Sequence, residues 1–404
     1  MEINDLLKEA VLAGASDLHV KAGSPPVFRK NGSLVMKQGA ETVSRDEAAR
    51  LAFSIMTAAQ QEEFKKEGDL DFAYGVAGLG RFRCNSFMQR GTIGLVFRVI
   101  PTKIPGVDEL MLPSVVKKLA LDERGLILVT GTTGCGKSTT LAAMIEHINA
   151  SKQVNIVTIE DPMEYLHKDK KSLLIQREVG ADTRSFTKAL RSAMRQDPDV
   201  ILVGEMRDFD TIQTALMAAE TGHLVLSTLH TLDAPETVNR IISFFPPHHQ
   251  HQIRIQLASV LRGVISQRLL PRVDGNGRVP AVEVLIVTGT IRDCIIDEDK
   301  TRLMHDFIEQ GKTIYGMQTF DQSLFGLYQD GLITLEEARR QASKPDDLLL
   351  KIKGVHNTQE MFGQGAGQDI DRGDQSREDQ PRGDQSRGDQ SRKGPDPEIE
   401  RFAR

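Results

Sequence analysis

Several features that this sequence lacks narrow the classes of protein to consider. The 404 residues include no tryptophan and three cysteines, and the formal net charge is -5. Cys84, Cys135 and Cys294 are too few and too scattered for a disulfide framework or a tetracysteine zinc site. A slightly acidic chain has no overall attraction to nucleic acid or to an anionic membrane surface. We therefore expect free thiols in a reducing compartment, no zinc and no nucleic-acid partner.

Long apolar segments are also missing. No run of about 18 apolar residues occurs, so no segment is predicted to span a membrane. The first five residues are acidic, where a secretory signal peptide would be basic. Both absences predict a cytoplasmic protein, and the length supports two ordinary domains with additional segments.

Residues 131–138 match the GxxxxGK[ST] phosphate loop, between an expected apolar strand and an expected helix. The glycines let successive backbone N–H groups point at phosphate oxygens, and the helix N-terminus adds partial positive charge. We expect Lys137 to reach the β- and γ-phosphates of ATP. A hydroxyl of Ser138 or Thr139 would bind Mg²⁺, with Ser138 favoured by its spacing. The expected nucleotide-binding residues are Gly131, Thr132, Thr133, Gly134, Cys135, Gly136, Lys137, Ser138 and Thr139.

Two strand ends supply the carboxylates that hydrolysis requires in addition to a phosphate loop. The first of these strands resembles a Walker B strand, but Gly204 occupies the usual aspartate position, so Glu205 is the only carboxylate at its end. We expect Glu205 to act with Ser138 in holding Mg²⁺, partly through water. The other strand end has three carboxylates within five residues, which are expected to help hold the metal or polarise the attacking water. These are Glu160, Asp161 and Glu164.

His223 and His230 flank one expected strand of the nucleotide-binding sheet. An imidazole near the γ-phosphate can report the presence of this group by hydrogen bonding, so both histidines are candidate sensors. The other histidines lack cysteine partners, which argues against zinc.

Three arginines, Arg81, Arg83 and Arg98, belong to expected strands of the first domain. Arg81 and Arg83 share one face because strand side chains alternate. In an oligomer such arginines can neutralise charge on a neighbour's γ-phosphate; otherwise they are ordinary surface residues.

The pattern along the chain predicts an α/β protein with two domains. Residues 1–100 are expected to form an α+β domain, and the proline-bearing segment 101–113 a linker. The expected helices of the first domain are 3–13 and 44–57. Its expected strands are 17–21, a hairpin at 27–35 around Asn31-Gly32, 69–74, 81–89 and 93–100.

From 114 onward, alternating aliphatic strands and helices predict a parallel sheet with crossovers. Beyond 282 the chain is expected to be mostly helical up to 353. Residues 354–404 are expected to be a disordered tail, because their five-residue repeats offer almost no apolar surface to bury. The strands of the sheet are expected at 126–130, 156–159, 200–203 and 224–228.

Taken together, these motifs resemble the secretion and pilus ATPases, and among them the PilT-like motors of type IV pilus retraction. The similarity spans about residues 1–353 and preserves the family's order of motifs. They are the run at 15–19, the phosphate loop, the Asp box at 160–164, the Walker B segment from 195 to Glu205, and the His box at 221–230.

The resemblance implies a ring hexamer built from a PAS-like N-terminal domain and a RecA-like ATPase domain, residues 114–353. The N-terminal domain would pack against a neighbour's RecA-like domain with nucleotide between them, and Arg83 and Arg98 match the family's arginine positions. Hydrolysis would drive rigid-body domain movement that turns an inner-membrane platform protein and disassembles pilin, placing the ring at the base of the pilus.

Alternatives remain within and beyond this family. Assembly and secretion ATPases carry an additional N-terminal domain and a tetracysteine zinc element, neither of which is present, so retraction is favoured. PilT-like proteins read AIRNLIRE where this chain reads TIRDCIID at 290–297, which leaves open an accessory motor of the PilU type, paired with a paralogous ATPase.

Two alternatives lie outside this family. The net negative charge of the chain argues against a RecA-like nucleic-acid translocase. A nucleotide-gated ring subunit without hydrolysis is the remaining alternative.

Overall fold

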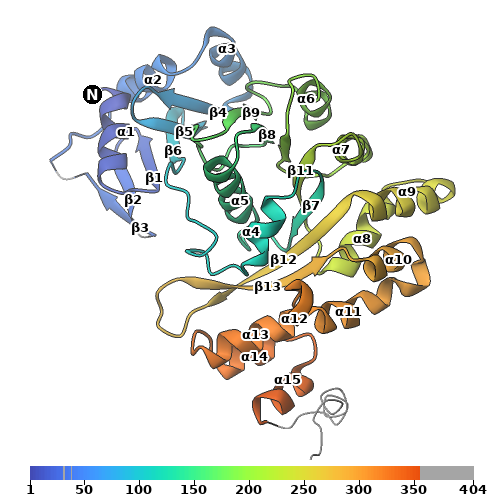
Figure 1. Ribbon diagram of the computed structural model, residues 1–404. Coiled ribbons are helices and arrows are strands. Elements are labelled where there is room, and N and C mark those ends of the chain that lie inside the picture. Colours follow the sequence, from blue (N-terminus) through green and yellow to red (C-terminus); the bar gives the residue numbers. More distant parts are fainter. Residues whose placement is uncertain (31, 38, 355–404) are drawn as a thin grey trace, which may run out of the picture. The chain divides into compact units, whose positions relative to one another are not determined.

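The computed structural model describes residues 1–30, 32–37 and 39–354. Residues 1–353 form one compact unit that contains two β-sheets with their helices (Figure 1). The α/β class expected from the sequence is confirmed, whereas the division at 101–113 stays a prediction. Asn31 of the expected hairpin turn and all of the expected disordered tail except Gly354 lie outside the described residues.

The N-terminal sheet has six strands in the order β3-β2-β1-β6-β5-β4, paired antiparallel. Leu6 of α1, Leu51 of α2 and Phe82 of β5 are buried in one cluster, so helices cover one face of this sheet. The strands are β1 (Asp17–Lys21), β2 (Val27–Lys30), β3 (Ser33–Met36), β4 (Asp69–Val76), β5 (Gly80–Gln89) and β6 (Thr92–Val99). The helices are α1 (Ile3–Leu12), α2 (Arg45–Ser54) and α3 (Ala58–Glu67).

The helix predicted at 44–57 is confirmed as α2, although it ends at Ser54, and a second helix, α3, that was not predicted follows it. Ser44 caps α2 by accepting from the Glu47 amide at 3.2 Å. Thr57 then accepts from the Gln60 amide while the Gln60 side chain accepts from the Thr57 amide at 2.9 Å. This reciprocal capping box begins a new helix, which ends at Gly68 in the left-handed conformation.

The second sheet has seven strands in the order β13-β12-β7-β11-β10-β8-β9. Its strands are parallel from β12 to β9, and β13 pairs antiparallel with β12. The strands are β7 (Gly125–Thr130), β8 (Asn155–Glu160), β9 (Leu173–Glu178), β10 (Val200–Val203), β11 (Leu224–Leu229), β12 (Leu261–Pro271) and β13 (Arg278–Ile286).

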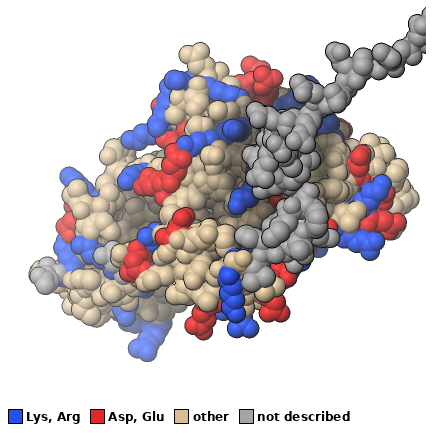
Figure 2. Space-filling view, turned by 60° about the horizontal axis from the view of Figure 1, so that its bottom comes forward, with Lys and Arg blue, Asp and Glu red and all other residues tan. Residues whose placement is uncertain are grey.

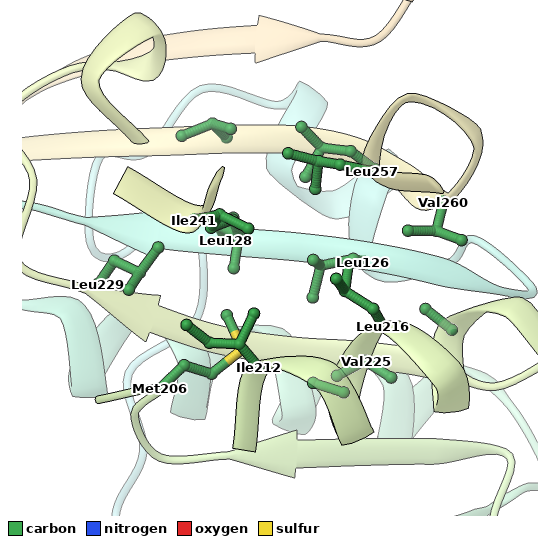
Figure 3. Packing of buried hydrophobic residues seen from close by; sticks show 14 of the residues in the cluster. Leu126, Leu128, Met206, Ile212, Leu216, Val225, Leu229, Ile241, Leu257 and Val260 are labelled. Carbon is green, nitrogen blue, oxygen red and sulfur yellow. The ribbon is translucent and has the colours of Figure 1, made fainter. Parts of the chain in front are cut away.

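Helices cover both faces of this sheet, which explains why every residue of β7 is buried. Leu126 and Leu128 of β7 pack on one face with Leu216 and Leu257, as Figure 3 shows. Ile127 and its neighbour Val129 point to the opposite face, toward α5. The helices are α4 (Val115–Ala120), α5 (Lys137–Ser151), α6 (Phe186–Ala193), α7 (Phe209–Glu220), α8 (Ala234–Ser243) and α9 (Pro247–Val260).

Three strands of this sheet, β9, β12 and β13, are missing from the sequence prediction. The expectation of a mostly helical chain beyond 282 does not hold for residues 283–286, which belong to β13. Strand β12 begins at the residue after α9 ends, so no loop separates a helix from a strand there. Both β9 and β13 are edge strands whose partners are set by the tertiary fold.

Residues after Ile286 are mainly helical, as expected. Phe320 and Leu348 from this region pack with Leu270 of β12 and Val279 of β13. The helices are α10 (Gly289–Ile296), the 3-10 helix η1 (Glu298–Leu303), α11 (Met304–Gln310), α12 (Lys312–Tyr315), α13 (Phe320–Gln329), α14 (Leu335–Gln341) and α15 (Pro345–Ile352).

Two surface features follow from the described residues. No helix among them combines the length and apolar character needed to cross a bilayer. On the face in Figure 2, basic and acidic side chains are interspersed, as is typical of a solvated surface.

The packing of β7 predicts a clear contrast between two leucines. Leu128→Ala should lower the free energy of unfolding by about 3–5 kcal/mol, because this fully buried side chain would leave a cavity in the core. Leu12→Ala is the matched control: Leu12 is 77% exposed, so the change should stay within about 0.5 kcal/mol. Urea unfolding measures both values, and equal losses would contradict the packing described here.

Candidate nucleotide site

The phosphate loop lies at the carboxyl end of β7 and leads into α5, beside a cavity of about 630 Å³. This cavity brings together most of the site residues expected from the sequence. From the loop come Thr133, Gly134, Gly136, Lys137, Ser138 and Thr139; from other elements come Glu160, Asp161, Glu164, Glu205, His230 and Arg98. Arg207, Arg278 and Tyr165 also line it and were not expected from the sequence.

The shape of the loop depends on close packing against β12. A Cβ atom at Gly131 would lie 2.5 Å from the Gln267 carbonyl oxygen and 2.6 Å from the Cys135 sulfur. Gly131 also has a φ of 136°, so a residue with a side chain does not fit here. Gln267 further exchanges hydrogen bonds with the Thr140 hydroxyl of α5 at 2.8 and 3.1 Å. Strand β12 therefore fixes both the start of the loop and the helix that follows.

Lys137 is held at the centre of this loop. Its Nζ atom donates to the carbonyl oxygens of Gly131 at 2.8 Å and Thr132 at 3.0 Å. Burial lowers the pKa of Lys137, against the opposing effects of Cys135 and Glu205. The ammonium group thus lies at the cavity wall and within the electrostatic reach of the Glu205 carboxylate.

The two candidate metal-binding hydroxyls differ in their surroundings. Thr139 Oγ1 lies 3.0 Å from the Tyr165 hydroxyl, in hydrogen-bond contact. Ser138 is exposed and lines the cavity. This difference favours Ser138 as the hydroxyl that meets a cation, in line with its position in the motif.

Glu205 is the second residue after β10 and lines the same cavity. One carboxylate oxygen lies 2.6 Å from Arg207 Nε and 3.6 Å from His230 Nε2. An aspartate at Gly204 would be crowded, because a Cβ atom there would lie 3.2 Å from the Ile159 carbonyl oxygen. The approach of β10 to the end of β8 thus accounts for the departure from the common Walker B pattern.

The carboxylates after β8 have distinct roles in the structure. Glu160 accepts hydrogen bonds from the Thr158 hydroxyl at 2.8 Å and the Glu164 amide at 3.3 Å. Burial raises the pKa of Glu160, against the lowering effect of these bonds and of Gln176. Glu160 therefore holds the turn that follows it, whereas Glu164 is exposed at the cavity.

The two histidines lie at opposite ends of β11. His230 follows the strand and lies near Glu205. His223 precedes the strand, and its Nδ1 lies 2.8 Å from the Ala218 carbonyl oxygen. A parallel strand of six residues separates them, so the structure does not bring His223 to the phosphate loop of the same subunit. The expectation that both histidines are candidate sensors is therefore corrected: within one subunit, His230 lies at the phosphate-loop end of β11 and His223 does not.

The arginines of the first domain share one face of the N-terminal sheet. Arg83 of β5 pairs in register with Arg98 of β6, and Arg98 pairs with Asp17 of β1. Arg98 Nε lies 2.9 Å from the buried Asp17 carboxylate, and Arg98 lines the nucleotide cavity of its own subunit. Arg83 is exposed. Arg81 instead pairs with Glu178 of β9 at 3.2 Å and connects the two sheets.

A family model described as "Type II/IV secretion system protein" matches residues 1–329. The chain belongs to this family. The type IV pilus retraction ATPase PilT of Pseudomonas aeruginosa is 46% identical over 347 residues, which cover 86% of this chain and 100% of the relative. The type IV pilus ATPase PilU of the same organism is 42% identical over 353 residues, covering 87% and 92%.

A solved structure supports the same assignment. The pilus retraction motor PilT with bound ADP matches with a TM-score of 0.79 and 47% identity, over 86% of this chain and 98% of that chain. The RecA-like fold and the ATPase class expected from the sequence are thereby confirmed. The chain is therefore an ATPase of the type II/IV secretion family that is similar to pilus retraction ATPases.

The crowding at Gly204 predicts that restoring the common motif impairs this family member. Gly204→Asp should lower kcat by about tenfold or more, because the new side chain displaces the ends of β8 and β10 and with them Glu205. Gly75→Ala is the control, since nothing lies within 4 Å of the added Cβ atom. Phosphate release measures kcat, and a faster Gly204→Asp enzyme would contradict the steric account.

The position of Glu205 predicts a selective loss of catalysis. Glu205→Gln should lower kcat by about a hundredfold or more while changing the nucleotide Kd only severalfold, because the loop and Lys137 still hold the phosphates. The control Glu41→Gln removes an exposed carboxylate from the first domain. Near-normal turnover of Glu205→Gln would assign Glu205 an ordinary surface role.

Proposed function

We propose that this chain is a Mg²⁺-dependent ATPase motor that works as a homohexameric ring on the cytoplasmic side of a type IV pilus base and powers pilus retraction. The observation that carries the proposal is one cavity lined by Lys137, Glu205, Glu164 and His230. An inner-membrane platform protein is the proposed target of the movement. A paralogous pilus ATPase is a further proposed partner, as the similarity to PilU suggests.

Each group in the cavity has a proposed part in hydrolysis. Lys137 and the loop amides bind the β- and γ-phosphates, and Ser138 with Glu205 offers the oxygen ligands that suit Mg²⁺. The cation neutralises charge that develops between the β- and γ-phosphates. Glu205 and Glu164 position the attacking water, and His230 senses the γ-phosphate through hydrogen bonding.

The N-terminal arginines are proposed to complete the site. Arg83 is exposed on the same sheet face as Arg98, and we propose that it reaches the nucleotide of a neighbouring subunit. Arg98, ion-paired with Asp17, would approach the phosphates from the same face. Arginines placed in this way stabilise the charge of the transition state, which phosphoryl transfer needs more than covalent chemistry.

Retraction is favoured over assembly by the extent of the similarity, since this chain matches the entire length of the retraction relative. A second candidate, an accessory motor of the PilU type, is favoured by the segment 290–297. Ile291, Cys294 and Ile295 of this segment are buried in the core beside α9. The departures from AIRNLIRE thus include a buried position, Cys294, and the fold of α10 accommodates it.

The proposed trans arginine predicts complementation between two inactive variants. Arg83→Ala and Lys137→Ala should each lower kcat by about a thousandfold. Co-assembled rings should regain part of the activity, because some interfaces then pair an intact arginine with an intact phosphate loop. Two affinity tags isolate the mixed rings, and phosphate release measures their activity.

Controls make this experiment decisive. Arg90→Ala removes an exposed arginine from the same hairpin and should retain activity. Mixed rings that stay as inactive as their parents would place Arg83 and Lys137 in the same subunit's site. Full activity of Arg83→Ala alone would remove this residue from the mechanism.

A further inference from the structure

A buried carboxylate outside the nucleotide cavity has no part in the chemistry described so far. Glu283 lies on β13 and is 1% exposed. Its Oε1 accepts a hydrogen bond from the Ala234 amide at 2.9 Å. Within the described residues, its Oε2 has no hydrogen-bond partner. A buried carboxylate that is only half satisfied is costly, so its position calls for a functional reason.

The residue that Glu283 holds lies close to the proposed sensor in the chain. Ala234 is the first residue of α8, four residues after His230. The other bonds of this segment are local: Thr231 contacts Thr237 at 2.7 Å, and the Leu232 amide donates to Glu236 at 2.8 Å. The bond to Glu283 instead ties the segment to a strand 49 residues further along the chain.

Glu283 also lies beside the strands that carry the phosphate loop. Its register partner on β12 is Ser266. The Ser266 hydroxyl accepts from Thr130 at 2.9 Å, and Thr130 is the last residue of β7 before the loop. One carboxylate thus lies between the sensor segment on one side and the support of the phosphate loop on the other.

Charged groups from three elements act on this carboxylate. Burial raises the pKa of Glu283 to about 7, while the bond from Ala234 lowers it. Asp233 at the start of α8 raises the pKa further, Arg268 of β12 lowers it, and Asp321 of α13 raises it. Glu283 is therefore a group whose charge changes near neutral pH.

We propose that Glu283 is a positioning residue for ATP hydrolysis, which holds the His230 segment against the sheet through the Ala234 amide and holds it more firmly in its ionised form. The physical reason is that a hydrogen bond to a carboxylate is stronger than one to a neutral carboxyl group. The negative charge also favours the N-terminus of α8. The inference rests on the proposed role of His230, so its test includes that residue.

The decisive measurement is the ratio of kcat between the wild-type chain and Glu283→Gln as a function of pH. The glutamine keeps a carbonyl acceptor for Ala234 and never ionises. Titrations of nucleotide and other residues cancel in this ratio. The ratio should rise from about one at pH 6 to about fivefold at pH 8.5, with its midpoint close to 7. A flat or falling ratio would overturn the proposal.

A double-mutant cycle separates this inference from the proposed function. In a His230→Asn background the same ratio should stay close to one at every pH, because Glu283 acts through the sensor segment. A ratio that still rises would overturn action through His230. If His230→Asn alone turns over normally, the sensing role itself fails, and the positioning role fails with it.

Two further variants test specificity. Glu236→Gln is the matched control, because Glu236 holds the same segment through Leu232 but is exposed. Its pH profile should match the wild type. Asp233→Asn keeps an N-cap acceptor for α8 but removes a charge that raises the pKa of Glu283. In this background, the midpoint of the pH dependence of the kcat ratio should therefore move to lower pH. A midpoint that does not move would contradict the titration of Glu283.

Stability gives a readout that does not depend on turnover. A carboxyl group whose pKa rises from 4.5 to about 7 on folding destabilises the folded state as pH increases through this window. The difference between the thermal midpoints of Glu283→Gln and the wild type should therefore increase in favour of Glu283→Gln between pH 4.5 and 7. Above pH 7 this difference should stay constant. Parallel profiles would show that Glu283 does not titrate as proposed.

Discussion

Four parallel strands end at one edge of the seven-stranded sheet, and the nucleotide chemistry depends on these ends lying side by side. Thr130 of β7 is level with Leu229 of β11, and Val203 of β10 is level with Ile159 of β8 and Ser227 of β11. The segments that follow carry the phosphate loop, the carboxylates and His230. Because these strands are almost wholly buried between two helical layers, they form a rigid support for groups that must keep fixed distances.

The sequence predicts those parts of the site that follow one another along the chain. The phosphate loop, Glu205 and the carboxylates at the end of β8 each have a local pattern, and most of these residues line the cavity. Gln267 and Glu283 have no such pattern, because their partners are distant in sequence and depend on how β12 and β13 pair. The case of His223 is different, because chain direction already separates the two histidines: His223 precedes β11, whereas His230 follows it and so lies at the carboxyl edge of the sheet, where the phosphate loop begins.

The N-terminal sheet contributes in a different way, through a row of charges across its strands. Registry places Arg83, Arg98, Asp17 and Arg29 in line across four neighbouring strands. The buried Asp17 carboxylate lies 2.9 Å from Arg98 and 3.8 Å from Arg29, and so orders the middle of this row. The ion pair of Arg81 with Glu178 links the end of β9 to that sheet. Such a link fits a motor in which nucleotide state moves one domain relative to another.

The central claim, that this ATPase powers pilus retraction, is tested most directly by imaging labelled pili in a strain that lacks the native gene and in the same strain carrying this chain. The account predicts that the deletion strain keeps surface pili that extend but do not shorten, and that the chain restores shortening. A deletion strain without surface pili would instead identify an assembly motor. Unchanged pilus shortening in the deletion strain would contradict the claim that this chain drives it.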